Sequence, residues 1–303
     1  MDNRIELMRV VVPPEASGQR LGEFLRRRGL SRTLINRLKN SEGILVNGEV
    51  RWTIDPVFAG EEVVLLLEDE PSSYVQPEPI PIAVVYEDDD VLAVNKPAGL
   101  IVHPARGYRN GTLANAVAYH LQQQGLEVPV RPVHRLDMET SGLVLFAKNP
   151  WAHNVMSLQL ERRLLRREYI AVVSGHLWPE DGQVNAPIRR VPNHPVKHEV
   201  GEGGRPALTY YRVVRKLKDA DLVELKLDTG RTHQIRVHMA YLGHPLLGDQ
   251  LYGGPTDRIQ RQALHAFRLR FRRPRDGEEI TLEAPLPQDM ADLIAQLEPE
   301  GQG

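Results

Sequence analysis

A proline-rich segment between Pro71 and Pro81 constrains the fold of this 303-residue chain more than any other feature. It holds four prolines and few large apolar side chains. A proline inside a helix removes a hydrogen bond and clashes with the preceding turn. We therefore expect a semi-extended linker over residues 71–82. The expected folding units are a small domain over residues 1–70 and a larger one over residues 83–303.

The smaller unit shows the pattern of two short helices followed by strands. Residues 21–25 and 34–38 carry apolar side chains at helical spacing, and Ser31 suits the N-cap of the second helix. Residues 44–46 and 63–67 are strand-like, and Asn47 begins a tight Asn-Gly turn. This arrangement leaves the basic side chains of the helices free to project outward, namely Arg26, Arg28, Arg32, Arg37 and Lys39.

The larger unit mixes strands and helices irregularly. Thr112 suits the cap of a helix over residues 113–124, and Asn149 that of a helix from Pro150 to about Leu165. Irregular alternation of this kind favours an α+β fold over a doubly wound one. The strands expected between these helices cover residues 91–94, 143–147, 169–173 and 223–227.

Composition excludes several classes of protein. The chain has no cysteine, which excludes disulfides, thiolate nucleophiles and zinc sites built on sulfur. No run approaches the roughly 18 apolar residues of a membrane helix. The first ten residues are charged where a signal peptide needs an apolar core. We therefore expect a soluble cytoplasmic protein.

Charge is strongly segregated, although the formal net charge is only −2. Residues 20–39 hold seven Arg or Lys and one acid, and residues 258–275 hold seven Arg and no acid. Residues 61–90 hold ten acids and no base. Ordinary solvated surfaces also produce such clusters. Because local fields steer a polyanion, however, two basic clusters beside an acidic connector favour a polyanionic partner.

Residues 134–142 are richer in polar groups than a core segment would need, yet they adjoin the expected strand 143–147. Asp137 lies two residues after Arg135, and a positive neighbour can hold such a carboxylate ionised. A simple loop with an Asp or Thr turn cap is the alternative.

Two further stretches concentrate functional groups. In residues 228–238, His233 and His238 have the wrong spacing for a zinc pair, because five residues separate side chains by about 140° on a helix and place them on opposite faces of a strand. We expect no metal site there. Arg231 and Arg236 remain candidates for pairing a carboxylate or phosphate, unless they are surface arginines at a helix start. Tyr169 opens a strand beside two arginines, either as a half-buried strand residue or as a platform for a nucleobase.

Four blocks of the chain stand out as motifs, namely NKPAGLIVHP at 95–104, HRLDMETSGLVLFAKN at 134–149, REYIAVVSG at 167–175 and GRTHQIRVHMAYLGHPLLGD at 230–249. In sequence and in order they closely resemble the RluA family of pseudouridine synthases. Residues 19–67 resemble an S4-type RNA-binding domain. The resemblance thus covers nearly the whole chain.

This resemblance implies an enzyme that converts uridine within folded RNA to its C5-linked isomer without a cofactor. It implies an α+β catalytic domain with a mixed, largely antiparallel central sheet, preceded by a small S4-like α/β domain. The catalytic aspartate matches Asp137 and the active-site tyrosine matches Tyr169. The basic partner of the aspartate is assigned to Arg231, with Arg236 as the competing choice.

A target base inside a helical stack must be turned out to be reached. We expect Arg135 to prop the vacated space, because a guanidinium plane both stacks and donates hydrogen bonds. The expected substrate is large-subunit (23S) ribosomal RNA, with transfer RNA as the main alternative, and the enzyme is expected to be a monomer. Further expected RNA contacts are His134, Arg236, Arg26, Arg28, Ser31, Arg32, Arg37, Lys39 and Asn47.

Two other function classes stay open. A non-catalytic RNA-binding or ribosome-assembly module would explain the S4-like segment equally well, but it would not need Asp137, Tyr169 and Arg231 together. A glycoside hydrolase would also use an aspartate at a sugar. Such enzymes usually need a second carboxylate, and the resemblance gives the nearby Glu139 no such role.

Overall fold

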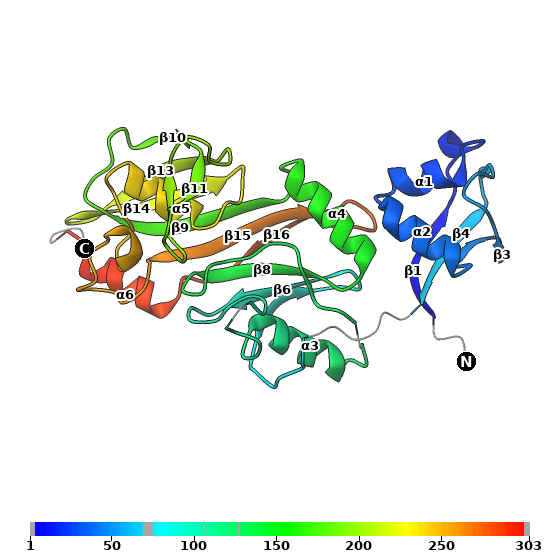
Figure 1. Cartoon of the computed structure of the whole chain (residues 1–303), viewed down its shortest axis with the longest axis horizontal. Helices are drawn as coiled ribbons and strands as arrows, with labels where there is room; N and C mark the ends of the chain where they lie inside the picture. Colours follow the sequence, from blue (N-terminus) through cyan, green and yellow to red (C-terminus); the bar gives the residue numbers. More distant parts are fainter. Residues whose placement is uncertain (1–3, 69–74, 106, 127, 300–303) are drawn as a thin grey trace.

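The computed structural model describes residues 4–68, 75–105, 107–126 and 128–299, and shows a small N-terminal unit beside a larger one (Figure 1). No helix in these ranges is long and apolar enough to cross a membrane.

The N-terminal unit is a four-stranded antiparallel sheet covered by two helices. Its strands are β1 (Arg4–Val11), β2 (Ile44–Val46), β3 (Glu49–Val50) and β4 (Glu62–Glu68), in the order β1-β4-β2-β3. A 3₁₀ turn, η1 (Pro14–Ala16), precedes the helices α1 (Leu21–Arg27) and α2 (Arg32–Asn40). The helices and strands expected from the sequence are confirmed here, and their apolar faces form one core.

Two residues of this unit that were expected to contact RNA have structural partners. The Ser31 hydroxyl accepts the Leu34 N–H at 3.2 Å and so caps α2. The Asn47 side-chain oxygen accepts the Glu62 N–H at 2.9 Å, which ties the Asn-Gly turn to β4.

The larger unit is built on a ten-stranded sheet, which confirms the α+β expectation. Eight strands follow the order β10-β13-β14-β9-β15-β8-β6-β5, while β16 pairs with β15 and β7 with β8. Their bounds are β5 (Ala83–Glu87), β6 (Val91–Lys96), β7 (Arg131–Pro132), β8 (Ser141–Ala147), β9 (Arg166–Ser174), β10 (Asp181–Asn185), β13 (Leu208–Lys216), β14 (Ala220–Leu227), β15 (Leu264–Arg272) and β16 (Glu279–Glu283). Within the described ranges, β8–β15 is the one parallel pair of this sheet, and a separate hairpin joins β11 (Ile188–Arg190) to β12 (His198–Val200).

Helices cover both faces of this sheet, as the burial of four consecutive residues at the start of β6 requires. Leu92 and Val94 pack in the core that contains α3 (Leu113–Gln123) and α5 (Gln234–Tyr241). Val91 and Ala93 pack in the core that contains α4 (Pro150–Glu161). The remaining elements are the 3₁₀ turn η2 (Gln250–Tyr252) and α6 (Gln288–Gln296), whose apolar side packs against β9 and β14.

The predicted helix starts are confirmed, and one predicted end is wrong. Thr112 and Asn115 form a reciprocal capping box on α3, and the Asn149 side chain caps α4. The helix that was expected to reach Leu165 ends at Glu161, because Arg163 adopts a left-handed conformation with φ of +61°.

The second half of the proline-rich segment is attached to the larger unit. Residues 69–74 lie outside the described ranges, whereas residues 75–82 form no helix or strand. Val75 is buried in the α3 core, the Asn115 amide donates to the Gln76 carbonyl at 2.8 Å, and the Glu78 carboxylate accepts the Gly111 N–H at 3.1 Å. These contacts anchor residues 75–78 beside α3. The division at 71–82 itself stays a prediction.

Candidate active site

One cleft of about 990 Å³ collects side chains from all three of the polar stretches identified in the sequence. Its lining includes residues 132–138, residues 227–236 and Tyr169. Leu136, Tyr169 and Ile235 belong to the core on the α3 and α5 face of the sheet, so the cleft opens on that face. His103 Nδ1, His134 Nδ1 and Arg167 Nε are buried at this cleft without a hydrogen-bond partner among the described residues. The cleft therefore has unused polar capacity for a ligand.

Asp137 is carried on the loop that enters β8. The loop closes on itself through the Thr140 N–H, which donates to the Asp137 carbonyl at 3.1 Å. Immediately afterwards, Gly142 has φ of +115°, and a Cβ there would lie 2.3 Å from the Ala266 carbonyl oxygen. Only glycine permits this approach of β8 to β15. The Ser-Gly pair of the signature thus sets where the loop, and with it the carboxylate, leaves the sheet.

Arg236 is the guanidinium that pairs with Asp137. Its Nη1 lies 3.2 Å from Asp137 Oδ2, while its Nε and Nη2 donate to Asp249 at 2.7 and 2.8 Å. Burial acts to lower the pKa of Arg236, but Asp249 and Asp137 together raise it above its ordinary value. The ring of Tyr252 also faces this guanidinium, 5.0 Å from its carbon. Arg236 is therefore a fixed cation, held in place by Asp249 and presented to Asp137.

The assignment of the aspartate's partner to Arg231 is wrong. Arg231 Nε donates to the Pro206 carbonyl at 2.9 Å, whereas the described cations within 4.0 Å of the Asp137 carboxylate are Arg236 and His233. The reason lies in the start of α5 at Gln234. Arg231 precedes the helix in a turn that the Gln234 side chain closes, whereas Arg236 lies in the first helical turn and is buried.

His233 is a cleft residue that the sequence analysis considered only as a metal ligand. It adopts a left-handed conformation at the N-cap of α5, and its Nδ1 lies 2.9 Å from the Tyr252 hydroxyl. Its Nε2 is 4.0 Å from Asp137 Oδ2. Burial lowers the pKa of His233 and outweighs Asp137, which raises it. The lowered pKa favours a neutral ring beside the carboxylate.

His238 does not share this site. Its two ring nitrogens lie 2.8 Å from Thr209 Oγ1 and 3.0 Å from the Ala186 carbonyl. In the described part of the chain, no group of three or more His, Cys, Asp or Glu is placed to hold a metal ion.

Tyr169 lines the cleft from β9 and is only 4% exposed. Burial raises the pKa of its hydroxyl, Arg167 lowers it and Asp137 raises it, and the net change is upward. The side chain therefore keeps its proton at neutral pH and offers the cleft a fixed aromatic ring.

The two residues just before the loop of Asp137 have different environments. Arg135 is exposed and lines the cleft. His134 is buried, and its Nε2 accepts the Leu145 N–H at 3.3 Å. Burial lowers the pKa of His134 to about 3, with Arg167 acting in the same direction. His134 is thus a neutral ring beneath the cleft and not an exposed RNA-binding cation.

Lys96, at the end of β6, is a second residue whose role the sequence analysis missed. It is fully buried, and its Nζ donates to the carbonyls of Pro97, Leu100 and Met138, each at 2.8 Å. Burial lowers its pKa to about 7, although Glu139 and Asp137 raise it. The contact with Met138 ties the loop of Asp137 to residues 97–100. The position of Lys96 in the block NKPAGLIVHP was the one sequence signal that could have identified this role.

None of the basic residues expected to contact RNA in the N-terminal unit lines the cleft. Figure 1 shows their helices, α1 and α2, at one end of the molecule and α5 at the other. Arg28 packs over the Phe24 ring and Lys39 faces the Trp52 ring. Arg37 donates to the Glu68 carbonyl at 3.0 Å. Arg26 and Arg32 are exposed.

Comparisons with known proteins identify the family of this chain. The family model described as RNA pseudouridylate synthase matches residues 90–241, half of the chain, and spans Asp137, Tyr169 and Arg236. RNA pseudouridine synthase YhcT of Bacillus subtilis is 43% identical over 87% of this chain and 88% of that protein. Ribosomal large subunit pseudouridine synthase D of Haemophilus ducreyi is 40% identical over 88% of this chain and 85% of that protein.

A solved structure gives the same result. The structure of human RNA pseudouridylate synthase domain containing 1 superimposes with a TM-score of 0.56 at 28% identity, covering 76% of this chain and all of that one. Fold, cleft and sequence likeness agree, and the chain accordingly belongs to the RNA pseudouridylate synthase family, whose enzymes isomerise uridine in RNA.

Proposed function

We propose that this enzyme isomerises uridine in large-subunit ribosomal RNA, with Asp137 acting at the ribose, Tyr169 holding the base and Arg236 pairing with the Asp137 carboxylate. The observation that carries the proposal is the 3.2 Å contact between Asp137 and a guanidinium that Asp249 fixes from behind. A carboxylate must be ionised to act at an electron-poor sugar carbon, and an adjacent cation favours that form.

The reaction exchanges the bond between C1′ and N1 of the uracil for one between C1′ and C5. Asp137 either adds to the sugar or promotes elimination from it, and in both routes the carboxylate is regenerated. The proton on C5 is lost and N1 gains one, so the product is an isomer and no cofactor is consumed. The cleft must hold the detached base and exclude water, because hydrolysis would leave an abasic nucleotide.

Tyr169 supplies the flat surface for the detached base, since aromatic side chains stack on nucleobases of any identity. Its raised pKa makes it a poor base at neutral pH, so stacking is its main role. Arg135, exposed at the cleft, props the space in the RNA from which the target nucleotide is turned out.

The ribosomal substrate is inferred from relatives named ribosomal large subunit pseudouridine synthase D, such as those of Haemophilus ducreyi and Neisseria meningitidis. We infer further that residues 4–68 act as an S4-like RNA-binding domain. Its exposed cations, including Arg26 and Arg32, hold phosphates by salt-sensitive contacts. We also infer a monomer that works in the cytoplasm.

The decisive test uses ribosomal RNA transcripts labelled with tritium at uridine C5. The wild-type chain should release tritium, and Asp137→Asn should abolish release while RNA affinity stays nearly unchanged. Glu139→Gln is the matched control, since this neighbouring carboxylate does not line the cleft and its loss should leave release intact. Full turnover by Asp137→Asn would refute the mechanism. RNA binding by the wild-type chain without any tritium release would favour a non-catalytic module.

A further inference from the structure

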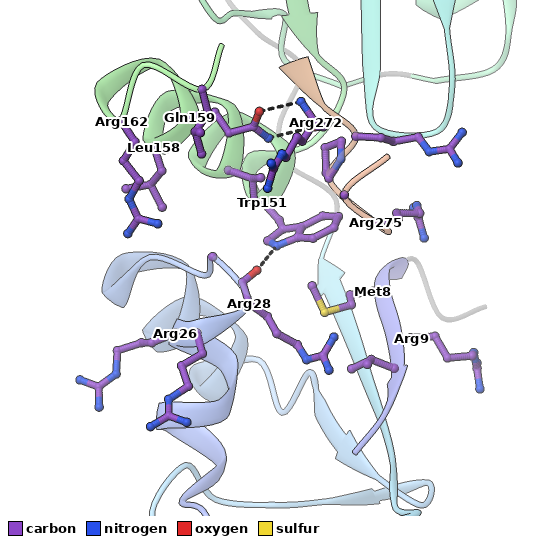
Figure 2. A pocket seen from close by; sticks show the side chains of 18 residues that line it. Met8, Arg9, Arg26, Arg28, Trp151, Leu158, Gln159, Arg162, Arg272 and Arg275 are labelled. Atoms are coloured by element: carbon purple, nitrogen blue, oxygen red, sulfur yellow. Dashed lines mark hydrogen bonds between the residues drawn. The ribbon is translucent and has the colours of Figure 1, made fainter. Parts of the chain in front are cut away.

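A second depression, of about 390 Å³, lies between the N-terminal unit and the catalytic domain (Figure 2). One wall is the end of α1 with part of β1, and the other is α4 with the turn between β15 and β16. This interdomain groove is separate from the catalytic cleft, because the two share no lining residue.

Specific contacts from α4 hold the two walls together. The Trp151 indole N–H donates to the Arg28 carbonyl at 2.8 Å, and the Asn154 amide donates to the Gly29 carbonyl at 2.7 Å. Trp151 is only 3% exposed and packs in the core of the N-terminal unit. A Cβ on Gly29 would approach the Val155 side chain to 2.7 Å, so the turn after α1 packs directly against the side chains of α4.

Among the residues that the structure describes, those lining the interdomain groove include no Asp or Glu. Figure 2 shows Arg26 and Arg28 on the α1 side and Arg162 and Arg272 on the catalytic side, with Trp151 between the two walls. Three of the lining arginines pair with acids outside the groove, namely Arg9, Arg273 and Arg275. The other five have no ion pair with any described residue, and they are Arg26, Arg27, Arg28, Arg162 and Arg272.

Bringing these five cations together is electrostatically unfavourable unless anions accompany them. Arginine is suited to this task, because its fork of donors matches phosphate oxygens and its charge persists at every physiological pH. The one large aromatic side chain of the groove, Trp151, is buried in the contact between the two units. The groove therefore offers charge for a sugar–phosphate backbone and no exposed platform for bases.

We propose that the interdomain groove binds the phosphodiester backbone of the substrate RNA and that both domains contribute to this site. This inference rests on the proposed function, which identifies the polyanion as RNA. It adds a second place on the protein where that RNA is bound. Since the arginines come from both walls, bound RNA also offsets their mutual repulsion and favours the docked arrangement. The site is independent of base sequence, because phosphates carry none.

Matched pairs of substitutions in the full-length chain test whether both walls contribute. Arg26→Gln with Arg27→Gln alters the α1 wall, and Arg162→Gln with Arg272→Gln alters the catalytic wall. Arg190→Gln with Lys218→Gln removes the same charge from two exposed positions, on β11 and just after β13, which form no ion pair with a described residue and lie far from the N-terminal unit (Figure 1). Affinity for an unmodified 23S ribosomal RNA transcript is measured over a range of KCl concentrations, with circular dichroism to verify folding.

Each released phosphate contact lowers the slope of log affinity against log salt by about 0.7–0.9, so each groove pair should lower it by about 1.5. The control pair should change it by much less. The proposal fails if the α1 pair lowers the slope and the catalytic pair does not, since the N-terminal unit would then act alone. It also fails if neither groove pair differs from the control, or if the wild-type chain binds polyglutamate of matched charge as tightly as RNA.

The tritium assay separates this inference from the proposed function. Slope losses in both groove pairs, together with a wild-type chain that releases no tritium from C5, would retain the groove and remove the catalytic proposal. Normal tritium release with unchanged slopes would retain the catalytic proposal and refute RNA binding in the groove.

Discussion

The catalytic cleft and the interdomain groove both present arginines, yet they use them in opposite ways. In the cleft, Arg236 is buried and held by Asp249 on one side and Asp137 on the other. In the groove, Arg26 and Arg162 are exposed and have no ion pair with a described residue. The fixed cation holds one carboxylate in position by a charge-assisted contact, whereas cations without an ionic partner create a field that attracts phosphates.

The same contrast separates the two arginine-rich segments of the sequence. In residues 258–275, every arginine except Arg272 forms an ion pair. Their acidic partners include Asp90 and Glu168, which are distant in sequence. In residues 20–39, α1 carries Arg26 and Arg27, which form no ion pair within the described part of the chain. The number of basic residues in a segment therefore does not reveal how much charge is available to RNA.

The largest expected effect follows from removing the fixed cation of the catalytic cleft. Arg236→Gln removes the cation beside Asp137 and leaves Asp249 buried and unpaired. We expect tritium release at saturating RNA to fall about 10²–10³-fold, comparable with the loss of a fixed donor in other active sites. The unpaired Asp249 should also lower the thermal unfolding midpoint. Arg231→Gln is the control, and an equal loss of turnover there would restore Arg231 as the aspartate's partner.

Acid should lower the free energy of unfolding of the catalytic domain, while the arginines of the interdomain groove stay charged. Burial lowers the pKa of His265 to about 4, from an ordinary value of 6.5. Between pH 6.5 and pH 4 this histidine is protonated in the unfolded chain but not in the folded chain. The stability that is present above pH 6.5 is therefore lost as the pH falls towards 4. One such histidine accounts for at most about 2 kcal/mol between pH 6.5 and pH 5.

Urea unfolding of wild-type and His265→Gln chains at pH 7 and pH 5 measures this effect. The substitution should reduce the difference between the two pH values, because the Gln side chain does not titrate. An unchanged difference would assign the acid sensitivity to other groups, of which buried His134 is the first to examine.

A moderate effect should follow from separating the two walls of the groove. Gly29 has φ of +83° and lies against Val155, whereas Gly18 has φ of +81° with no atom near the position of a Cβ. Gly18→Ala should carry only the backbone strain, about 1–2 kcal/mol. Gly29→Ala should carry the same strain and also push α4 away from α1.

Small-angle scattering and RNA affinity report this separation. Gly29→Ala should expand the chain and weaken RNA binding, and Val155→Ala in the same chain should partly restore both. If Gly18→Ala produced the same expansion, backbone strain and not the contact with α4 would be responsible.

The smallest effect sharpens the contrast between unpaired and paired arginines. Arg32→Gln should lower the salt slope of RNA affinity by about 0.7–0.9. Arg268→Gln should leave it nearly unchanged, because that guanidinium already donates to Glu283 and Glu168. Equal slopes for the two variants in binding to a ribosomal RNA transcript would contradict the distinction.

Local signals in the sequence predicted much of the architecture. The capping residues Thr112 and Asn149 and the strand at 91–94 needed only neighbouring residues, and the structure confirms all three. Placing Asp137 and Tyr169 in one cleft required the family resemblance, because 32 positions of chain separate them.

Other features depended on information that the sequence does not display. The choice between Arg231 and Arg236 turns on where α5 begins, and His233 decides this by adopting a left-handed conformation that single-residue propensities disfavour. The role of Lys96 depends on three carbonyls brought together only by the folded loops. The partners of the arginines in residues 258–275 likewise come from distant segments.

Trp151 belongs to the catalytic domain by chain order and to the N-terminal unit by packing. The boundary between the two units in sequence is therefore not the boundary between their cores. Transplanting residues 4–68 onto an unrelated protein would leave an empty socket beneath Arg28, and the catalytic domain alone would expose an indole to water. An exchange of N-terminal units between relatives should therefore keep Trp151 together with the core residues of the N-terminal unit that surround it.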